Sequence, residues 1–141
     1  MRISQVQAIF RSLGIECRVD VFRSMDGTNA YEALLVFVEQ YFSSPTNIPS
    51  AGNHLKIQNT WLPPIYLQCR GHSMTIIGLE IRTNGSRNLL VFDPAYQPSI
   101  AMKYFLSENP QMPHPGWILG RYRPAARQLR KLERFETLRL V

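Results

Sequence analysis

The length, composition and charge of this chain describe a folded protein with one domain. Its 141 residues are 45% hydrophobic and 11% aromatic, enough apolar content for a real core and too much for a disordered chain. The two cysteines form no CxxC pair and no disulfide framework, which fits a reducing compartment. We expect no secretory signal, because residues 1–16 contain no apolar h-region, and no membrane span, because no apolar run approaches roughly 20 residues. We therefore expect one domain over residues 1–141, in the cytoplasm, the nucleus or both, without membrane contact.

The net charge of +6 is concentrated near the C-terminus. Residues 120–141 carry seven basic and two acidic side chains, whereas the charges of the other residues nearly cancel. Such a segment is either a surface for an acidic partner, for example a nucleic acid, or the solvated side of a helix. The helix side would consist of Arg127, Arg130, Lys131 and Arg134. We favour the solvated helix and keep nucleic-acid binding through this basic C-terminal segment as the alternative.

Hydrophobic periodicity predicts two helices and one strand in the first forty residues. Val6, Ile9, Phe10 and Leu13 recur at helical spacing, whereas residues 15–22 alternate apolar and polar, as a half-buried strand does. The predicted elements are, in order, a helix over Ser4–Leu13, a strand over Ile15–Phe22, a turn at Asp26-Gly27 and a helix capped by Thr28 or Asn29 that ends near Phe42.

The remainder of the chain is predicted to alternate strands, loops and short helices. Residues 43–62 are predicted to form a loop of about twenty residues, a length that often borders a binding site. The other predicted elements are strands over Ile65–Gln68, Met74–Ile81 and Asn88–Phe92, a turn at Asn84-Gly85, a helix near Ser99–Leu106, a Pro-rich bend over Asn109–Pro115, a basic helix near Pro124–Leu132 and a final strand over Glu133–Val141. The second and third strands are apolar almost throughout, which predicts that both faces of their hairpin are covered. The fold class is α+β.

Two polar residues stand at the rims of this hairpin, His72 where one apolar strand begins and Asp93 where the next one ends. A lone imidazole and a lone carboxylate in these places are a common way to hold a base and the group that orients it. The alternatives are a histidine that hydrogen-bonds a carbonyl and an aspartate that starts a turn before Pro94. With a two-residue turn, Asp93 would lie opposite Ile76, about 13 Å from His72. The pair therefore requires an asymmetric turn, a bulge or a bent His72 segment.

Four motifs around this pair carry a resemblance to a known family. They are Pro63-Pro64-Ile65-Tyr66-Leu67-Gln68, Gly71-His72-Ser73-x-Thr75, Gly78-x-Glu80 and Leu89-Leu90-Val91-Phe92-Asp93-Pro94. Together they resemble the C-terminal half of the papain-like cysteine peptidases that remove ubiquitin-fold modifiers. The similarity covers about residues 3–107 and is to the branch with the zinc-finger ubiquitin peptidase and fungal deubiquitinases. It implies that His72 is a general base, that Asp93 orients it, and that the partner is ubiquitin, polyubiquitin or a ubiquitin-like modifier.

The chain departs from the family pattern at two points. Asp93-Pro94-Ala95 lacks the histidine that follows Asp-Pro in the branch acting on the ubiquitin-fold modifier proper, which favours the deubiquitinase branch. The family nucleophile lies in a Trp-Gly-Cys-Gly-Tyr motif that this sequence does not contain. We therefore expect the C-terminal portion of a papain-like cysteine peptidase fold, with an antiparallel sheet core and flanking helices. Without its nucleophilic cysteine, this portion is expected to be inactive as an isolated chain.

Neither cysteine of the chain is expected to replace that nucleophile. Cys17 shares the apolar phase of the first strand and is predicted to be a core thiol. Cys69 lies on the same segment as His72, whereas a papain-like site brings its cysteine from a separate helix. Cys69 and His72 are also spaced like half a zinc site, which His54 or His114 would complete, but no second pair stands at ligand spacing. We expect no metal and no cofactor.

Two alternatives come from other classes of protein. One is a pseudo-peptidase that holds ubiquitin through the sheet and the long loop without cutting it, and ubiquitin affinity that is insensitive to replacing His72 would favour it. The other is a nucleic-acid-associated protein that uses the basic C-terminal segment, for which salt-dependent DNA binding is the signature. Trp61, Tyr96 and Trp117 are assigned to the core or its rim and not to ubiquitin contacts.

Overall fold

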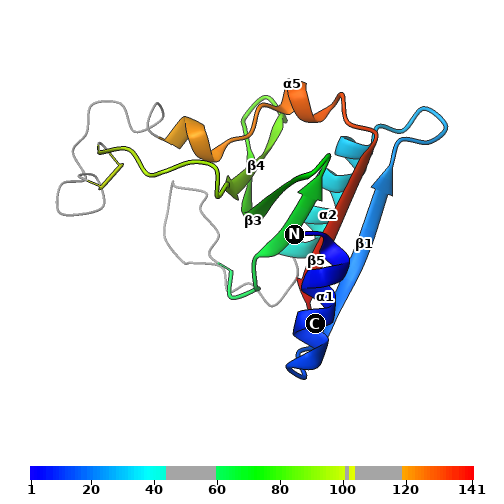
Figure 1. The fold of residues 1–141 in the computed structure, drawn as a ribbon. Helices are drawn as coiled ribbons and strands as arrows, with labels where there is room; N and C mark the ends of the chain where they lie inside the picture. Colours follow the sequence, from blue (N-terminus) through cyan, green and yellow to red (C-terminus); the bar gives the residue numbers. More distant parts are fainter. Residues whose placement is uncertain (44–59, 101, 104–118) are drawn as a thin grey trace.

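Five strands form one antiparallel sheet in the computed structural model, which describes residues 1–43, 60–100, 102–103 and 119–141. Their order is β1-β5-β2-β3-β4 (Figure 1). The strands are β1 (Cys17–Arg23), β2 (Ile65–Cys69), β3 (His72–Ile81), β4 (Arg87–Phe92) and β5 (Arg134–Leu140). The helical elements are α1 (Ile3–Ser12), α2 (Ala30–Phe42), the 3₁₀ turn η1 (Gly120–Tyr122) and α5 (Ala126–Leu129). This is the predicted α+β class with an antiparallel sheet and flanking helices.

The strand nearest the C-terminus, β5, is an interior strand of the sheet, between β1 and β2. Leu138 of β5 stands opposite Val19 of β1 on one side and opposite Tyr66 of β2 on the other. The alternation of residues 134–140 predicts a strand, but a period of two gives no information on which strands are its neighbours. β5 therefore connects β1, the first strand of the chain, to the remainder of the sheet.

The helix α2 packs on one face of the sheet, which we call the α2 face. Asn29 caps this helix, because its side-chain oxygen accepts a hydrogen bond from the N–H of Tyr31 at 2.9 Å. Burying a large apolar side chain fully contributes about 1.5–3 kcal/mol, so the layer between α2 and the sheet is the core of the molecule. Its buried side chains include Tyr31, Leu34, Leu35, Val38, Leu67, Ile76 and Phe135.

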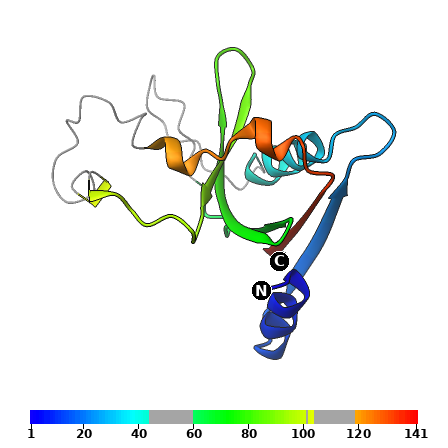
Figure 2. The same cartoon turned by 45° about the horizontal axis from the view of Figure 1, so that its top comes forward.

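The opposite face of the sheet is covered less completely. There α1 lies over β1 and β5 (Figures 1 and 2), where Ile3 and Val6 pack against Leu138. Towards β4 this face is more open, and Phe92 is 54% exposed. The prediction that both faces of the β3–β4 hairpin are covered is therefore wrong for this face. The buried side chains of that hairpin are on the α2 face and are Met74, Ile76, Leu89 and Val91.

The helix before β5 is shorter than predicted. It spans four residues, Ala126–Leu129, instead of residues 124–132. Its N-cap, Ala125, has no side-chain acceptor for the first N–H groups. The N–H groups of Lys131 and Leu132 bond to carbonyls three residues back, which is the tighter 3₁₀ pattern. Basic side chains do not by themselves lengthen a helix that lacks a cap and must end before a strand.

Several predicted segments lie wholly or partly outside the described residues. Most of the loop over residues 43–62 belongs to them, and so does the Pro-rich bend over residues 109–115. His54, His114 and Trp117 lie in these segments. Within the described part of the helix predicted near residues 99–106, Lys103 N–H bonds to the Ser99 carbonyl at 3.0 Å.

Candidate active site

A tight turn places His72 at the first position of β3. Cys69 and His72 are directly paired, so only Arg70 and Gly71 lie in the turn. Both have positive φ, 42° and 79°, the pattern of a type I′ hairpin turn. Glycine adopts this conformation freely, but an arginine there is uncommon. The sequence predicts a wider gap between these strands, over residues 69–73.

The β3–β4 hairpin departs twice from a hairpin with a two-residue turn. At the turn, Gly85 N–H bonds to the Arg82 carbonyl and Arg82 N–H bonds to the Ser86 carbonyl, both at 2.9 Å, which closes a three-residue loop. Further along, the register shifts between Ile76 and Gly78. The residue between these two positions is an extra residue in β3, which is a β-bulge. The asymmetric turn and the bulge, two of the features that the His72–Asp93 pair required, are therefore both present.

Each of these departures moves β4 by one position along β3. Beyond the bulge Thr75 stands opposite Phe92, so Asp93 falls level with Met74 and not with Ile76. Two shifts of one position keep Asp93 on its original face, because the side-chain period of a strand is two. That face is the α2 face, and His72 lies on it as well.

His72 and Asp93 form a direct hydrogen bond. The distance between His72 Nε2 and Asp93 Oδ2 is 2.8 Å. The second oxygen of Asp93, Oδ1, accepts the N–H of Ala95, also at 2.8 Å. The Asp93 side chain is 10% exposed and the His72 side chain is 45% exposed. The carboxylate is thus fixed at both oxygens, while the imidazole is held at one nitrogen and open at its other end.

The same geometry shows which of the predicted hydrogen bonds each residue makes. Asp93 does start a turn, because its carbonyl accepts the N–H of Tyr96 at 3.0 Å, but it also binds the histidine. His72 bonds to this carboxylate and not to a carbonyl. The contact of Ala95 with Asp93 was not anticipated, although Asp-Pro is a recognised turn start.

The two cysteines occupy different environments. Cys69 is 5% exposed, and burial, together with the negative charge of Asp93, raises the pKa of its thiol. A raised pKa disfavours the thiolate, which is the nucleophilic form. Cys17 is half-buried on the α1 side of the sheet, and the register puts it on the face opposite to His72. Cys17 therefore packs on the α1 side of the sheet but is less buried than the predicted core thiol.

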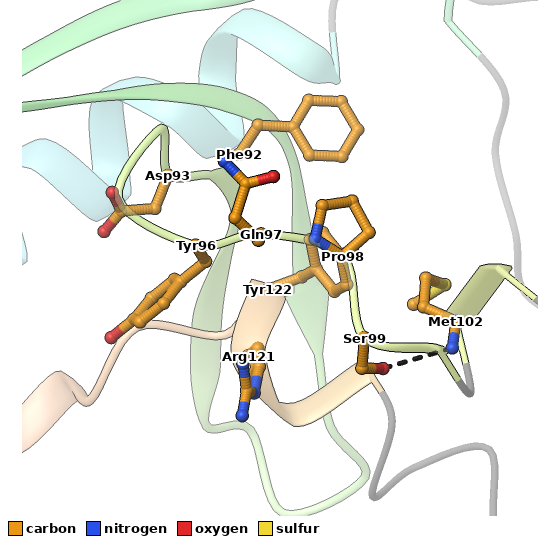
Figure 3. Close-up of a pocket in the computed structure, with 9 residues that line it drawn as sticks. All are labelled: Phe92, Asp93, Tyr96, Gln97, Pro98, Ser99, Met102, Arg121 and Tyr122. Atoms are coloured by element: carbon orange, nitrogen blue, oxygen red, sulfur yellow. Dashed lines mark hydrogen bonds between the residues drawn. The ribbon is translucent and has the colours of Figure 1, made fainter.

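A pocket of about 380 Å³ adjoins Asp93 (Figure 3). Its walls are mainly apolar and aromatic, with Arg121 as the one cation among the described lining residues. In Figure 3 Asp93 and Met102 stand at opposite ends of the group, and Ser99 Oγ accepts the Met102 N–H at 3.1 Å. Tyr96, which also lines the pocket, is 56% exposed. The further lining residues are Phe92, Gln97, Pro98 and Tyr122.

The basic C-terminal segment is largely neutralised within the chain. Four of its seven cations form ion pairs with carboxylates of other elements or of β5 itself. The four side chains predicted to be solvated, Arg127, Arg130, Lys131 and Arg134, are all exposed, although only Arg127 lies within α5. The pairs are Arg123–Glu80, Arg130–Glu32, Arg134–Glu136 and Arg139–Asp20.

Two further observations concern the described residues alone. They contain no group of three or more His, Cys, Asp or Glu side chains that could hold a metal ion. His54 and His114, the residues considered for a zinc site with Cys69 and His72, are not among them. No helix in the described part of the chain is long and apolar enough to cross a membrane.

A histidine and a carboxylate hydrogen-bonded at neighbouring strand ends are the base and orienting group typical of hydrolases that use a nucleophilic side chain. The family model of peptidase family C78 matches residues 4–138. The chain therefore belongs to peptidase family C78, which confirms the predicted resemblance and the papain-like fold class.

Curated relatives agree with this family. The chain is 33% identical over 106 residues to zinc finger-containing ubiquitin peptidase 1 of Rattus norvegicus. The matched region covers 74% of this chain and 17% of the relative. The protein of the same name from Mus musculus is 35% identical and that from Homo sapiens 33% identical, over the same shares. The chain thus spans only about a sixth of the length of these relatives.

Proposed function

We propose that His72 is the general base and Asp93 the orienting carboxylate of a cysteine peptidase that releases ubiquitin or a ubiquitin-like modifier from its conjugates. The observation that carries this proposal is the 2.8 Å hydrogen bond between His72 Nε2 and Asp93 Oδ2. Membership of a peptidase family supports the reaction class. The relatives are named as ubiquitin peptidases, which supports the substrate.

The hydrogen bond assigns a role to each nitrogen of the imidazole. Nε2 donates its proton to Asp93, so the neutral ring has Nδ1 free of a proton. None of the described residues donates a hydrogen bond to Nδ1, and the 45% exposure of the side chain lets an outside group reach it. Nδ1 would take the thiol proton as the sulfur attacks the carbonyl carbon and would later give it to the leaving amine. The Asp93 carboxylate stabilises the imidazolium between these two transfers.

We also propose that the nucleophilic cysteine lies outside these 141 residues. Burial and a raised pKa oppose thiolate formation at Cys69, and Cys17 lies on the other side of the sheet. The isolated chain would then be inactive. Both cysteines are free, which suits the cytoplasmic or nuclear location that we propose.

A ubiquitin with a thiol-reactive group at its C-terminus tests the position of the nucleophile. We expect the 141-residue chain to keep its intact mass when incubated with this probe, and to leave ubiquitin chains uncut. An adduct that disappears in Cys69→Ser and persists in Cys17→Ser would show that Cys69 is the nucleophile and would contradict the proposal. Cleavage of ubiquitin chains that is lost in His72→Ala would contradict the inactivity of the isolated chain.

The roles of His72 and Asp93 are tested where a longer form of the protein supplies the nucleophile. Removing a general base typically lowers the rate about 10²–10⁴-fold, and we expect a loss of this size in kcat for His72→Ala. Asp93→Asn is expected to lower kcat with little change in KM. Ubiquitin binding that is unaffected by His72→Ala, in a protein that never cleaves or forms an adduct, would instead identify a ubiquitin-binding module.

A further inference from the structure

Tyr122, the last residue of η1, and Arg123, the residue after it, contact the β3–β4 hairpin from the face opposite to α2. Arg123 donates two hydrogen bonds to Glu80 of β3, from Nε to Oε2 at 3.0 Å and from Nη2 to Oε1 at 2.9 Å. Asn88 of β4 donates its side-chain N–H to the same carboxylate at 3.2 Å. One carboxylate therefore joins β3, β4 and the segment after η1. Paired hydrogen bonds between a guanidinium and a carboxylate also fix the relative orientation of the two groups.

The second contact of this segment lies next to Asp93. The ring of Tyr122 meets the ring of Phe92 edge-on, with centroids 5.8 Å apart and planes at 82°, a favoured aromatic geometry. Phe92 directly precedes Asp93, and both rings stand beside the strand end that carries this aspartate (Figure 3). We call Tyr122 and Arg123 the hairpin clamp.

The positions of these contacts matter because of the bulge between them. Glu80 lies on the turn side of the bulge and Phe92 on its far side. A slip of one residue in β4 would move Asp93 to the other face of the sheet, since successive side chains alternate. β4 is an edge strand, so β3 is the only strand among the described residues that fixes its register by pairing. The hairpin clamp supplies side-chain contacts on both sides of the place where this register is irregular.

We propose that Tyr122 and Arg123 are positioning residues, which hold β4 in the register where Asp93 reaches Nε2 of His72. Neither side chain touches the imidazole. The functional importance of this role rests on the proposed function, but the geometric role is independent of any peptidase activity. A clamp that merely stabilised the fold would leave the His72–Asp93 hydrogen bond unchanged when it is weakened.

The Nε2 proton of His72 reports this hydrogen bond directly. Its exchange rate with solvent can be followed by NMR in the 141-residue chain labelled with ¹⁵N-histidine, and Asp93→Ala gives the rate for the broken bond. We expect Tyr122→Ala and Arg123→Ala each to accelerate this exchange at least about tenfold, towards the Asp93→Ala rate. Tyr122→Phe keeps the ring and is expected to retain the slow rate. Arg127→Ala, in the same basic segment but exposed, is the matched control and is expected to change nothing.

The outcomes separate the clamp from the proposed function. If Asp93→Ala does not accelerate exchange, the His72–Asp93 pair itself is absent in solution and the proposed function fails with it. If Asp93→Ala accelerates exchange but both clamp variants stay slow and folded, only the clamp is overturned. Amide spectra of α1 and β1, which do not contact the clamp, report folding. Should an alanine variant unfold, Tyr122→Leu and Arg123→Gln replace it, and an unchanged exchange rate in these variants overturns the proposal equally.

Discussion

At the scale of the residue, burial separates the chemistry of Cys69 from that of its paired neighbour His72. Burial and the charge of Asp93 raise the pKa of the Cys69 thiol, so less thiolate exists at neutral pH in the folded chain than in the unfolded one. We therefore predict that iodoacetamide modifies Cys69 at pH 7.5 at least about tenfold more slowly in the folded chain than in urea. Intact mass, measured over time in Cys17→Ser, gives the rate for Cys69 alone. Equal rates in the two conditions would show that this thiol is accessible and not perturbed.

At the scale of the element, two glycines of the β2–β3–β4 region differ in what their backbone requires. Gly71 has a φ of 79° in the tight turn before His72, whereas Gly78 beside the bulge has ordinary strand geometry with Leu90 Cδ1 3.6 Å from an added Cβ. We predict that Gly71→Ala lowers the free energy of unfolding by about 1–2 kcal/mol, because an L-residue is strained there. Gly78→Ala should stay within about 1 kcal/mol of the parent, since its site tolerates a Cβ. Urea denaturation compares the two, and equal losses would argue against the assigned turn.

In β3, Glu80 makes the free energy of unfolding depend on pH. The hydrogen bonds from Arg123 lower the pKa of this carboxyl below 4.5, its usual value. As pH falls, the unfolded chain therefore takes up the proton first, and the stabilisation present above about pH 4.5 is lost as pH drops through the lower folded-state pKa. We predict that Glu80→Gln costs about 1 kcal/mol at pH 7, because hydrogen bonds to charged groups are worth this much or more. The difference from the parent should shrink below about pH 4. Glu16→Gln, at an exposed position, is the control, and a pH-independent difference would contradict the assignment.

At the scale of the whole molecule, the basic segment belongs to the fold. Its internal ion pairs leave Arg121, Arg127 and Lys131 without a described carboxylate partner. Removing residues 120–141 would also remove β5, the strand between β1 and β2, so DNA binding has to be tested by substitution. We predict that replacing these three residues by Gln changes the slope of log K against log salt by less than about 1 for duplex DNA, whereas phosphate contacts by all three would change it by about 2.7. Fluorescence anisotropy between about 50 and 200 mM salt measures this slope. A much larger change would restore the nucleic-acid interpretation.

How much of this structure the sequence predicts depends on the range of the interactions. Local patterns predict a cap at Thr28 or Asn29, of which the structure shows Asn29, and they predict the strands beside His72 and Asp93, because capping and period-two alternation act over a few residues. The distance of about 13 Å between His72 and Asp93 in a regular hairpin indicates that some irregularity is needed. The sequence does not show that a bulge lies between Ile76 and Gly78. The place of β5 between β1 and β2 and the contact of Arg123 with Glu80 depend on segments 43 or more residues apart. No periodicity within either segment records such a pairing.

The position of β5 between β1 and β2 has a consequence for folding during synthesis of the chain on the ribosome. β5 begins roughly 65 residues after β2 ends, and a ribosome adding about 5–20 residues per second needs on the order of 3–13 s to make that stretch. During this interval β1 and β2 each present an unpaired edge on the nascent polypeptide, and such edges invite pairing with other chains. The sheet of this domain therefore cannot be completed until β5 has been translated. Chaperones that shield β1 and β2 during these seconds would increase the yield of folded protein in the cell.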